Sequence, residues 1–424
     1  MTYNSKASCK IRAYLADGAC LPALEKILVK NRIGYILVAY ASMLCYGLLD
    51  NSRGPAYPYI LDRFQVSNQA GSMLFAIASF AGLIMILFGR AWLGRIGELG
   101  GQRLFLFLMF FGASITGIAD RMGGFPLLLC GSFILGLGLG GSTLSTNILV
   151  AFGTSASSSR RVFSGLHSMY GIASITAPLL FAVSIKAGIP WSTVIIAFSF
   201  TPLLVLVASS RTSQFAHEPE KSRKPDGISA WTRSRVGLIV SFYVAGEIVL
   251  SSRMVFYLSK ESGMNPADAS YYLGLFFTLL LTGRLLFSSF HFRWSSFAIM
   301  LTSIVSSILL FILGIALHPM MLSMCGFSMS FYFPCAMDWI SKRYGTNAGY
   351  MMTSVMASVA ALSILMHWGV GTVADIAGAR TSISLGPLFL LLSLIVMIST
   401  RGEFIGSDGS GKKSGHTPKP SYPM

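Results

Sequence analysis

Long apolar runs of about 20 residues recur along the whole chain and are separated by short polar stretches. An α-helix needs about 20 mostly apolar residues to cross roughly 30 Å of hydrocarbon. The runs fall into two sets of six, which cover residues 34–60, 70–89, 104–119, 125–151, 163–184 and 188–208, and then 236–258, 267–289, 296–316, 318–340, 348–373 and 381–399. The pattern therefore predicts an all-α membrane protein with twelve transmembrane helices.

The polar stretches between these runs divide the chain into regions. The longest internal stretch, residues 209–235, separates the two sets of runs and is the predicted boundary between two bundles. Near the N-terminus, Leu21–Val29 either lies along the membrane surface or belongs to a frayed cytoplasmic arm. The predicted regions are an N-terminal cytoplasmic arm, a six-helix bundle, a cytoplasmic linker, a second six-helix bundle and a disordered cytoplasmic tail, at residues 1–33, 34–208, 209–235, 236–402 and 403–424.

Composition and charge agree with a membrane protein. The 424 residues are 53% hydrophobic and 11% charged, whereas a soluble domain has about 25% charged residues. The net charge of +16 is spread over short loops without a domain-sized basic face, so we expect no nucleic-acid partner. About 25 of the 32 Lys and Arg residues fall on one side of the predicted membrane. Because cytoplasmic loops are enriched in basic residues, we expect a multi-pass plasma (inner) membrane protein with both termini in the cytoplasm.

Motifs typical of metal sites and ATP-driven pumps are absent from the sequence. It has no CxxC or HExxH, no His/Cys cluster at metal-ligand spacing and no GxxxxGK[ST] loop. The few ionisable residues in the apolar runs are scattered, whereas an active site gathers reactive groups at one depth. We therefore predict no cofactor and no metal, and we expect that the protein is not an enzyme.

Two turns in the two halves of the chain resemble each other. Leu61–Ser72 and Leu258–Ser270 each run from a helix end, through a short charged turn, into a helix that starts at Asn or Ser. Both lie between the first and second spans of their set. Many transporters are built from parallel repeats, so this pairing predicts two pseudo-symmetric bundles.

Three longer motifs resemble those of a known family. GRAWLGRIGELGGQR follows the second span (Gly89–Arg103), GLGLGGSTLSTN lies in the fourth (Gly136–Asn147) and GLHSMYGIASITAP lies in the fifth (Gly165–Pro178). Together with the six-plus-six arrangement, they resemble the major facilitator superfamily, although Gly94 stands where the family has an Asp. The resemblance implies two six-helix bundles and transport by alternating access.

Shorter motifs are similar to the fucose-permease-like sugar:proton symporters of that superfamily. They are GLLDNSRGPAYP in the first span (Gly47–Pro58), AGE in the seventh (Ala245–Glu247) and Gly283–Arg284 in the eighth. This similarity implies a sugar-like solute that moves together with protons. The sequence departs from the branch at Gly54 and near Gly141–Thr143, where the branch has its two membrane acids.

Asp50, in the first span, is a candidate for both substrate binding and proton coupling. A charge inside a span costs about 2.5–3.5 kcal/mol on insertion scales and so needs a reason. Pro55 and Pro58 each remove a backbone donor, which predicts a broken helix beside a binding site. The alternative is a simple pair between Asp50 and Arg53, three residues apart. The neighbouring Asn51 is a candidate substrate contact.

Two more ionisable side chains lie in the seventh span. Glu247 is a candidate coupling group, and Arg284 of the eighth span lies on the order of 9 Å further in, at 1.5 Å per residue, within reach of it. The two either serve coupling and gating or form a structural pair that locks two helices together. Arg253 either grips an anionic substrate through two hydrogen bonds or extends outward to the membrane interface.

The remaining candidates each have a structural alternative. His167, near the cytoplasmic end of the fifth span, is a candidate gate or proton carrier, or simply a hydrogen-bonded helix-end histidine. His367 and Trp368 are a candidate sugar-stacking pair, although Trp often lies at the membrane interface. Asn147 and Tyr170 are candidate substrate contacts, and for Asn147 the alternative is hydrogen bonding between helices.

The glycines of the fourth span have a structural interpretation, because small residues let helices approach closely. They are Gly136, Gly138, Gly140 and Gly141.

These features predict a monomeric secondary active transporter that moves a small polar, sugar-like solute across the lipid bilayer, coupled to protons. An exporter of drugs, siderophores or other amphiphiles on the same fold is the first alternative. Against it, Ala177–Pro178 is followed by Leu-Leu-Phe, whereas drug antiporters have further glycines there. A non-transporting membrane sensor or enzyme is the second alternative.

Overall fold

The computed structural model describes residues 21–122, 124–154, 159–213, 227–289, 294–402 and 404, and these residues form helices joined by short turns, with no strand among them. The first half of the chain forms α2 (Leu21–Phe64), α3 (Asn68–Ile96), α4 (Glu98–Met122), α5 (Phe125–Gly153), α6 (Ser159–Lys186) and α7 (Trp191–Ser209). The second half forms α8 (Ala230–Glu261), α9 (Pro266–Ser289), α10 (Ser296–Ala316), α11 (Met320–Met329), α12 (Tyr332–Tyr344), the short 3₁₀ helix η1 (Gly345–Asn347), α13 (Ala348–Ile383) and α14 (Leu385–Ser399).

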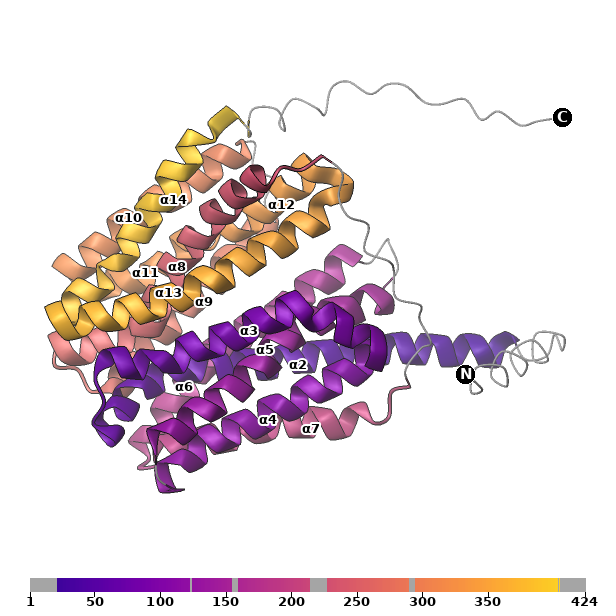
Figure 1. Cartoon of the computed structure of the whole chain (residues 1–424), viewed down its shortest axis with the longest axis horizontal. Coiled ribbons are helices and arrows are strands. Elements are labelled where there is room, and N and C mark those ends of the chain that lie inside the picture. Colours follow the sequence, from indigo (N-terminus) through magenta and orange to yellow (C-terminus); the bar gives the residue numbers. More distant parts are fainter. Residues whose placement is uncertain are drawn as a thin grey trace.

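The helices divide into two bundles, α2–α7 and α8–α14, which Figure 1 shows in purple and in orange to yellow. Within the described residues, eleven helical segments are long and apolar enough to span a membrane, with α11 and α12 counted as one segment, and α14 is a shorter apolar helix. Each of the twelve predicted spans therefore corresponds to a helical segment. The prediction of an all-α membrane fold with two bundles is confirmed.

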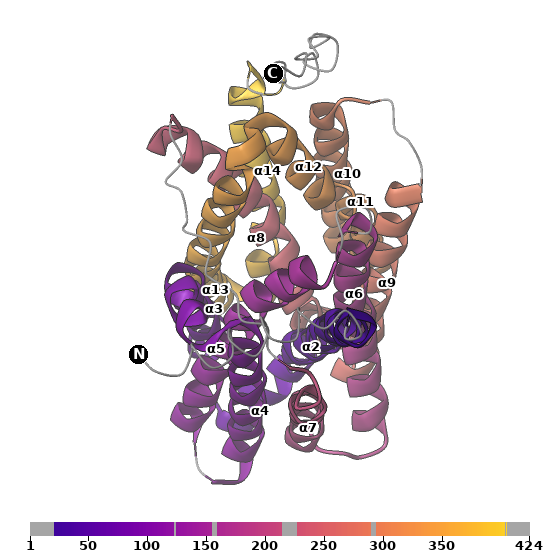
Figure 2. The same ribbon diagram turned by 90° about the vertical axis from the view of Figure 1, so that its right-hand side faces the viewer.

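The chain enters and leaves this fold on the same side. The first residues of α2 and the last residues of α14 lie at one end of the molecule, which we call the terminal face; the opposite end is the far face (Figure 1). Figure 2 views the molecule from its terminal face, with the second bundle above the first. The bundles contact each other mainly through α3 with α13, α6 with α9, and α2 with α8.

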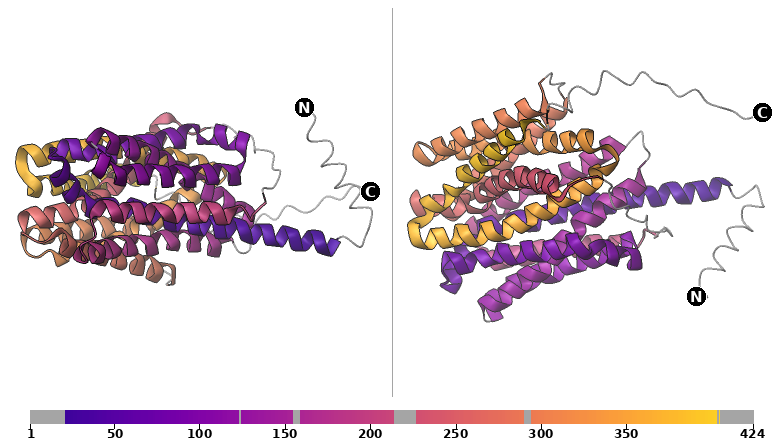
Figure 3. Two further views of the ribbon diagram at one scale, coloured as in Figure 1. Left: turned by 90° about the horizontal axis from the view of Figure 1, so that it is seen from below. Right: turned by 45° about the horizontal axis from the view of Figure 1, so that its top comes forward.

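The first helix is longer than the sequence pattern predicts. α2 runs without interruption from Leu21 to Phe64 and extends past the other helices at the terminal face (Figure 3). Leu21–Val29 is thus the first part of α2, not a separate surface segment or a frayed arm. Pro55 and Pro58 lie inside the same helix, so the prediction of a broken helix is wrong. A proline removes a donor, but neighbouring helices hold the chain in register.

Other predicted boundaries also shift. α8 begins at Ala230, six residues before the predicted start, because the Ser229 hydroxyl accepts a hydrogen bond from the Thr232 amide at 3.0 Å and caps the helix. α13 continues past the predicted end at residue 373 and bends at Gly378, whose φ of 84° needs glycine. Most of the predicted arm, linker and tail, at residues 1–20, 214–226 and 405–424, lies outside the described residues.

The predicted repeat appears in the two far-face turns. Gln65 (φ 49°) precedes Ser67, whose hydroxyl accepts from the Ala70 amide at 3.2 Å. In the second half, Gly263 (φ 62°) precedes Asn265, whose side-chain oxygen accepts from the Ala267 amide at 2.9 Å. Both turns thus place a left-handed residue two positions before a side chain that caps the next helix. This match confirms that the two halves are built alike at these turns.

The glycines of α5 set the spacing of the first bundle. A Cβ atom added to Gly136 would lie 2.4 Å from the Ala78 carbonyl oxygen of α3, and one added to Gly138 would lie 2.7 Å from the Met109 amide nitrogen of α4. Real Cβ atoms do not approach backbone so closely. Alternate glycines therefore let α5 pack against α3 on one face and α4 on the other, as the sequence predicted.

We predict that Gly136→Ala destabilises the protein, because the new methyl group forces α3 and α5 apart. Overpacking of this kind costs about 1–3 kcal/mol, which thermal unfolding of the purified protein in detergent measures as a lowered midpoint. Gly349→Ala is the matched control, because a Cβ at Gly349 meets nothing within 4 Å. Equal midpoints for the two variants would contradict the close packing of α3 and α5.

Candidate functional site

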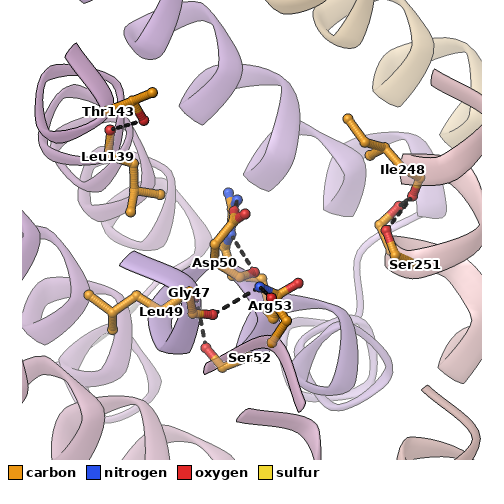
Figure 4. A network of polar contacts seen from close by, with 12 residues as sticks. Gly47, Leu49, Asp50, Ser52, Arg53, Leu139, Thr143, Ile248 and Ser251 are labelled. Atoms are coloured by element: carbon orange, nitrogen blue, oxygen red, sulfur yellow. Dashed lines mark hydrogen bonds and ion pairs between the residues drawn. The ribbon is translucent and has the colours of Figure 1, made fainter. Parts of the chain in front are cut away.

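Asp50 lies in the middle of α2 and contacts two other side chains. Its carboxylate forms an ion pair with Arg53 on the same helix, and it accepts a hydrogen bond from the Tyr170 hydroxyl of α6 at 3.1 Å. Figure 4 shows Asp50 and Arg53 at the centre, with Thr143 of α5 and Ser251 of α8 on opposite sides of them. The pairing that was the structural alternative for Asp50 is thus present. The Tyr170 contact adds a link between helices, which pairing within α2 alone does not provide.

The next residue along α2 extends this link. The Asn51 side-chain nitrogen donates to the Ser174 hydroxyl of α6 at 3.0 Å and to the Gly47 carbonyl at 2.9 Å. The rings of Tyr46 and Tyr170 lie with their centroids 5.5 Å apart. The structure therefore brings three predicted site residues, Asp50, Asn51 and Tyr170, into one polar seam between α2 and α6.

A second cluster surrounds the ring of Phe75 on α3. The guanidinium carbons of Arg53 and Arg253 lie 5.4 and 5.0 Å from the ring centroid, and the ring of His367 on α13 stacks on it at 5.0 Å. Arg253 comes from α8, so the cluster joins both bundles. We call Arg53, Arg253 and His367 the cationic cluster, after its two guanidinium groups.

Arg253 is held at this junction by neutral groups. Its Nη2 donates to the Ser72 hydroxyl at 2.9 Å, and its guanidinium lies 4.3 Å from the centroid of the Tyr57 ring. The residue is only 2% exposed, so the predicted alternative of a side chain that extends outward to the interface is wrong. The other bundle accounts for this, because Tyr57 and Phe75 cover the side chain with aromatic surface.

Several polar atoms of the cationic cluster are buried and have no hydrogen-bond partner. They are Arg53 Nη1, Arg253 Nε, Arg253 Nη1 and His367 Nδ1. Buried polar atoms are nearly always paired in folded proteins. Four such atoms around one aromatic ring therefore make this junction a candidate ligand site.

Glu247 and Arg284 form a looser pair in the second bundle. Glu247 Oε1 and Arg284 Nη2 lie 3.9 Å apart, with the two side chains 19% and 27% exposed. This distance allows an ion pair but exceeds that of a hydrogen bond. The predicted contact is therefore present, and its length and exposure leave both groups open to exchange partners.

Asp50 and Glu247 occupy related places in the two bundles. Asp50 lies 17 residues before the capping Ser67, and Glu247 lies 18 residues before the capping Asn265. Since α2 and α8 are the first helices of their bundles, the two carboxylates lie within about one residue, or 1.5 Å of rise, of the same depth.

Three predicted candidates make no direct contact with these groups. The Asn147 side chain donates to the Thr143 carbonyl of its own helix at 2.6 Å, so it links no other helix. Trp368 is 48% exposed on the outer face of α13, although its neighbour His367 is buried. His167 is exposed on α6 and forms no hydrogen bond or ion pair with another described residue, but it lies close enough to Arg284 of α9 to interact with it electrostatically.

Packing is close at Gly54 and at Gly141, two glycines where the sequence departs from the sugar:proton branch. A Cβ at Gly54 would lie 3.1 Å from the Ser251 carbonyl oxygen of α8, and one at Gly141 would lie 2.3 Å from the Phe105 ring. An acidic side chain at Gly54 or Gly141 would therefore require its neighbours to shift. The carboxylate of α2 instead stands one turn earlier, at Asp50.

Sequence reasoning missed part of the cationic cluster. Tyr57, Ser72 and Phe75 carry no signal in an apolar run, and Arg53 was considered only as a partner for Asp50. His367 was considered with Trp368, yet only His367 reaches the cluster. The helical periodicity of α13 could have identified His367 as buried. Its buried face consists of residues 363, 366, 367, 370 and 371, which recur at helical spacing.

Two contacts hold the bundles together at the far face. Asp375 of α13 accepts hydrogen bonds from the Asn68 and Gln69 amides at 2.7 and 2.8 Å and so caps α3 from the other bundle. Lys186 of α6 and Asp268 of α9 form an ion pair at 2.5 Å. The far face is therefore the closed end of the interface between the bundles.

The described part of the chain contains no metal site, and it contains a small, mainly apolar cavity. No group of three His, Cys, Asp or Glu side chains there could hold a metal ion. A small cavity lies beside Arg53 inside the first bundle and is lined mainly by apolar side chains such as Leu49, Leu74 and Ile195. Its lining residues all belong to helices of the first bundle, α2, α3, α4, α5 and α7.

Comparison with known proteins identifies the fold. The family model described as Major Facilitator Superfamily matches residues 39–366. A search of curated proteins finds no match. The matched family covers both bundles, so the sequence resemblance at the level of the superfamily is confirmed.

Solved transporter structures share this fold at low sequence identity. A bacterial homologue of the human lysosomal transporter Spinster, inward-facing and unoccupied, has a TM-score of 0.66 and 13% identity over 90% of this chain and 98% of its own. FucP, in the outward conformation, has a TM-score of 0.61 and 18% identity over 86% of this chain and 99% of its own. The nucleoside transporter NupG has a TM-score of 0.69 and 12% identity over 88% of this chain and 100% of its own. The sugar branch is thus one of several similar groups.

We predict that Asp375→Ala opens the far face. The substitution leaves two amides of α3 without acceptors, and loss of a cap costs about 0.5–2 kcal/mol, or about a 2- to 30-fold change in the ratio of closed to open forms. Spin labels at Gln65 and Ser384, one on each bundle, report the change as a longer distance component in pulsed electron paramagnetic resonance.

The matched control for this experiment is Asp62→Ala, which removes an exposed far-face carboxylate on the first bundle. It should leave the distance distribution unchanged. The same distribution in Asp375→Ala and the unsubstituted protein would mean that the cap does not hold the bundles together.

Proposed function

The chain belongs to the Major Facilitator Superfamily of transporters, and from this premise we propose that it moves a small polar solute of sugar size across the membrane together with protons. The transport mode is that of a secondary transporter with alternating access, in which two bundles rock about a solute site between them. Proton coupling and the class of solute are the parts that this proposal adds.

The observation that carries the proposal is the pair of carboxylates at matching depth. Asp50 is paired with Arg53 in the first bundle, and Glu247 lies 3.9 Å from Arg284 in the second. Ionisable groups are rare inside membrane spans and mark proton relays and substrate paths. One such group in the first helix of each bundle is what a coupled transporter needs on the two sides of its solute.

Glu247, in the looser of the two ion pairs, is better suited to proton coupling than Asp50. When Glu247 takes up a proton it loses its attraction to Arg284, and the partly exposed guanidinium is free to move with its helix. Asp50 is held more tightly, because it has two partners, Arg53 and Tyr170. It suits a role in positioning the solute beside the seam between α2 and α6, where Asn51 also lies.

The far-face contacts support alternating access. Asp375 of α13, which caps α3, and the Lys186–Asp268 pair close one end of the interface between the bundles, and all of these groups are polar and near the surface. Polar contacts at a rim exchange with water at small net cost. They are therefore suited to a closure that forms and breaks in each transport cycle.

We further propose that the terminal face is cytoplasmic, that the membrane is the plasma (inner) membrane and that the transporter works as a monomer. The support for orientation is the excess of Lys and Arg in the loops of the terminal face. Examples among the described residues are Arg95, Arg103, Arg233 and Arg343.

We predict that Glu247→Gln separates solute movement from proton movement. Glutamine keeps the size of the side chain but cannot take up a proton, so solute exchange across liposome membranes should persist while accumulation is lost. A proton that crosses 100 mV supplies about 2.3 kcal/mol, or roughly 50-fold accumulation, and the variant should fall to about 1-fold. Internal pH and labelled solute are measured together, over a panel of sugars, organic acids and cationic dyes.

Asp50→Asn and Asp338→Asn complete this experiment. Asp50→Asn should weaken binding and exchange as well as accumulation, since it disrupts the contacts to Arg53 and Tyr170. Asp338 forms an exposed pair with Lys342 within α12, so Asp338→Asn should leave transport unchanged. Solute-driven proton entry that survives both Glu247→Gln and Asp50→Asn would rule out these carboxylates as coupling groups.

A further inference from the structure

We propose that the solute of this transporter carries an oxyanion, a carboxylate or a phosphate, which binds to the cationic cluster of Arg53, Arg253 and His367 at the junction of the two bundles. The inference rests on the proposed function as a carrier of a small polar solute and narrows its chemistry. A sugar acid or a sugar phosphate has the required size and charge.

The charge of Arg253 is the first reason. The residue is 2% exposed, and no carboxylate of the described residues lies within ion-pairing distance of it. Its Nη2 donates a hydrogen bond to the neutral Ser72 hydroxyl, and the nearby Tyr57, also neutral, offers a cation–π attraction through its ring. A buried charge without a counter-ion is strongly destabilising, so this position calls for an anion.

The helix spacing explains why the protein itself supplies none. In α2, Asp50 and Arg53 are three residues apart, which places them on one face of the helix. In α8, Glu247 and Arg253 are six residues apart, which turns them to different faces at 100° per residue. Glu247 therefore pairs with Arg284. Arg253, which lies at the level in the second bundle that Arg53 has in the first, has no carboxylate partner on its own helix.

The free donors of Arg253 match an oxyanion. Nε and Nη1 have no partner, and Ser72 takes only one of the two hydrogens on Nη2. One complete pair of adjacent N–H donors is therefore available, in the fork geometry that binds both oxygens of a carboxylate or two oxygens of a phosphate.

The other two members of the cluster extend the site. Arg53 Nη1 and His367 Nδ1 are also buried without partners, and both side chains lie against the same Phe75 ring as Arg253. They come from α2 and α13, so an anion held there contacts both bundles. Contact with both bundles is what couples solute binding to their rocking motion.

The competing role for Arg253 is a lock between the bundles, through Ser72, Tyr57 and Phe75. Such a lock would be indifferent to the charge of the solute. The two roles therefore predict different results when this guanidinium is changed. An oxyanion site loses affinity for anions more than for neutral sugars, whereas a lock loses affinity for both equally.

The test measures binding of gluconate, glucose 6-phosphate and glucose to the purified full-length protein in detergent, by calorimetry and by ligand-induced thermal stabilisation. At least one of the two anions should bind more tightly than glucose. Arg253→Met should weaken that anion on the order of 100-fold, and Arg253→Lys, which keeps the charge but loses the fork, about 10-fold. His367→Gln should weaken it several-fold.

Two further variants keep the result interpretable. Lys260→Met removes an exposed cation from the far-face end of the same helix and should leave anion affinity unchanged. Ser72→Ala removes the hydrogen bond that Arg253 Nη2 donates to Ser72 but none of the free donors of Arg253, so anions should still bind more tightly than glucose in this variant. If Arg253→Met fails to fold, Arg253→Lys and His367→Gln still test the site.

The outcomes separate this inference from the proposed function. Glucose binding as tight as that of both anions, or anion affinity that Arg253→Lys and His367→Gln leave unchanged, overturns the oxyanion site. So does an equal loss for anions and glucose in Ser72→Ala and Arg253→Lys, which is the result expected of a lock. In any of these cases, solute-driven proton entry into liposomes by the unsubstituted protein would leave the proposed function standing.

Discussion

The cost of burying charge in a bilayer accounts for the position of almost every ionisable side chain in the described part of this protein. Water is absent from the hydrocarbon, so a charge there needs a partner within the protein or a bound ligand. Asp50 has Arg53 and Tyr170, and Glu247 has Arg284. Arg253 is the exception, since its direct contacts are with the neutral Ser72 hydroxyl and the rings of Tyr57 and Phe75 and it has no counter-ion among the described residues, and an exception to so strict a rule is where function is to be sought.

The two halves use one architecture for two purposes. Their far-face turns share a left-handed residue followed by a capping side chain, and their first helices carry an acid at nearly the same depth. The difference is the spacing from acid to arginine, three residues in α2 and six in α8. Because of this difference, Arg53 has a carboxylate partner on its own helix. Arg253 has none and lies at the junction between the bundles.

Movement between conformations depends on how the contacts are distributed. Within the first bundle, α5 meets α3 and α4 through glycines that leave no free space, so the bundle moves as a rigid body. Between bundles, the far-face contacts are polar and near the surface, as at Asp375. A rigid interior and an exchangeable rim are the physical requirements of rocking about a central site.

The sequence alone determined the membrane fold, the division into two bundles, the repeated turn and the role of the α5 glycines. These features depend on hydrophobic length and on residue size, which act locally along the chain. It also indicated Asp50, Asn51, Tyr170, Glu247 and Arg284, because a polar group in an apolar run is conspicuous. It was wrong about a break at Pro55 and Pro58 and about an Arg253 that extends outward.

Only the tertiary structure decided which of these groups meet. Tyr57, Ser72 and Phe75 are unremarkable in an apolar run, yet they surround Arg253 because α2, α3 and α8 cross at that level. His367 reaches the same ring from a residue 292 positions away from Phe75 in the chain, while the adjacent Trp368 faces outward. Such contacts depend on the rotation of each helix about its axis and on the packing of two bundles, and no local pattern of residues encodes either.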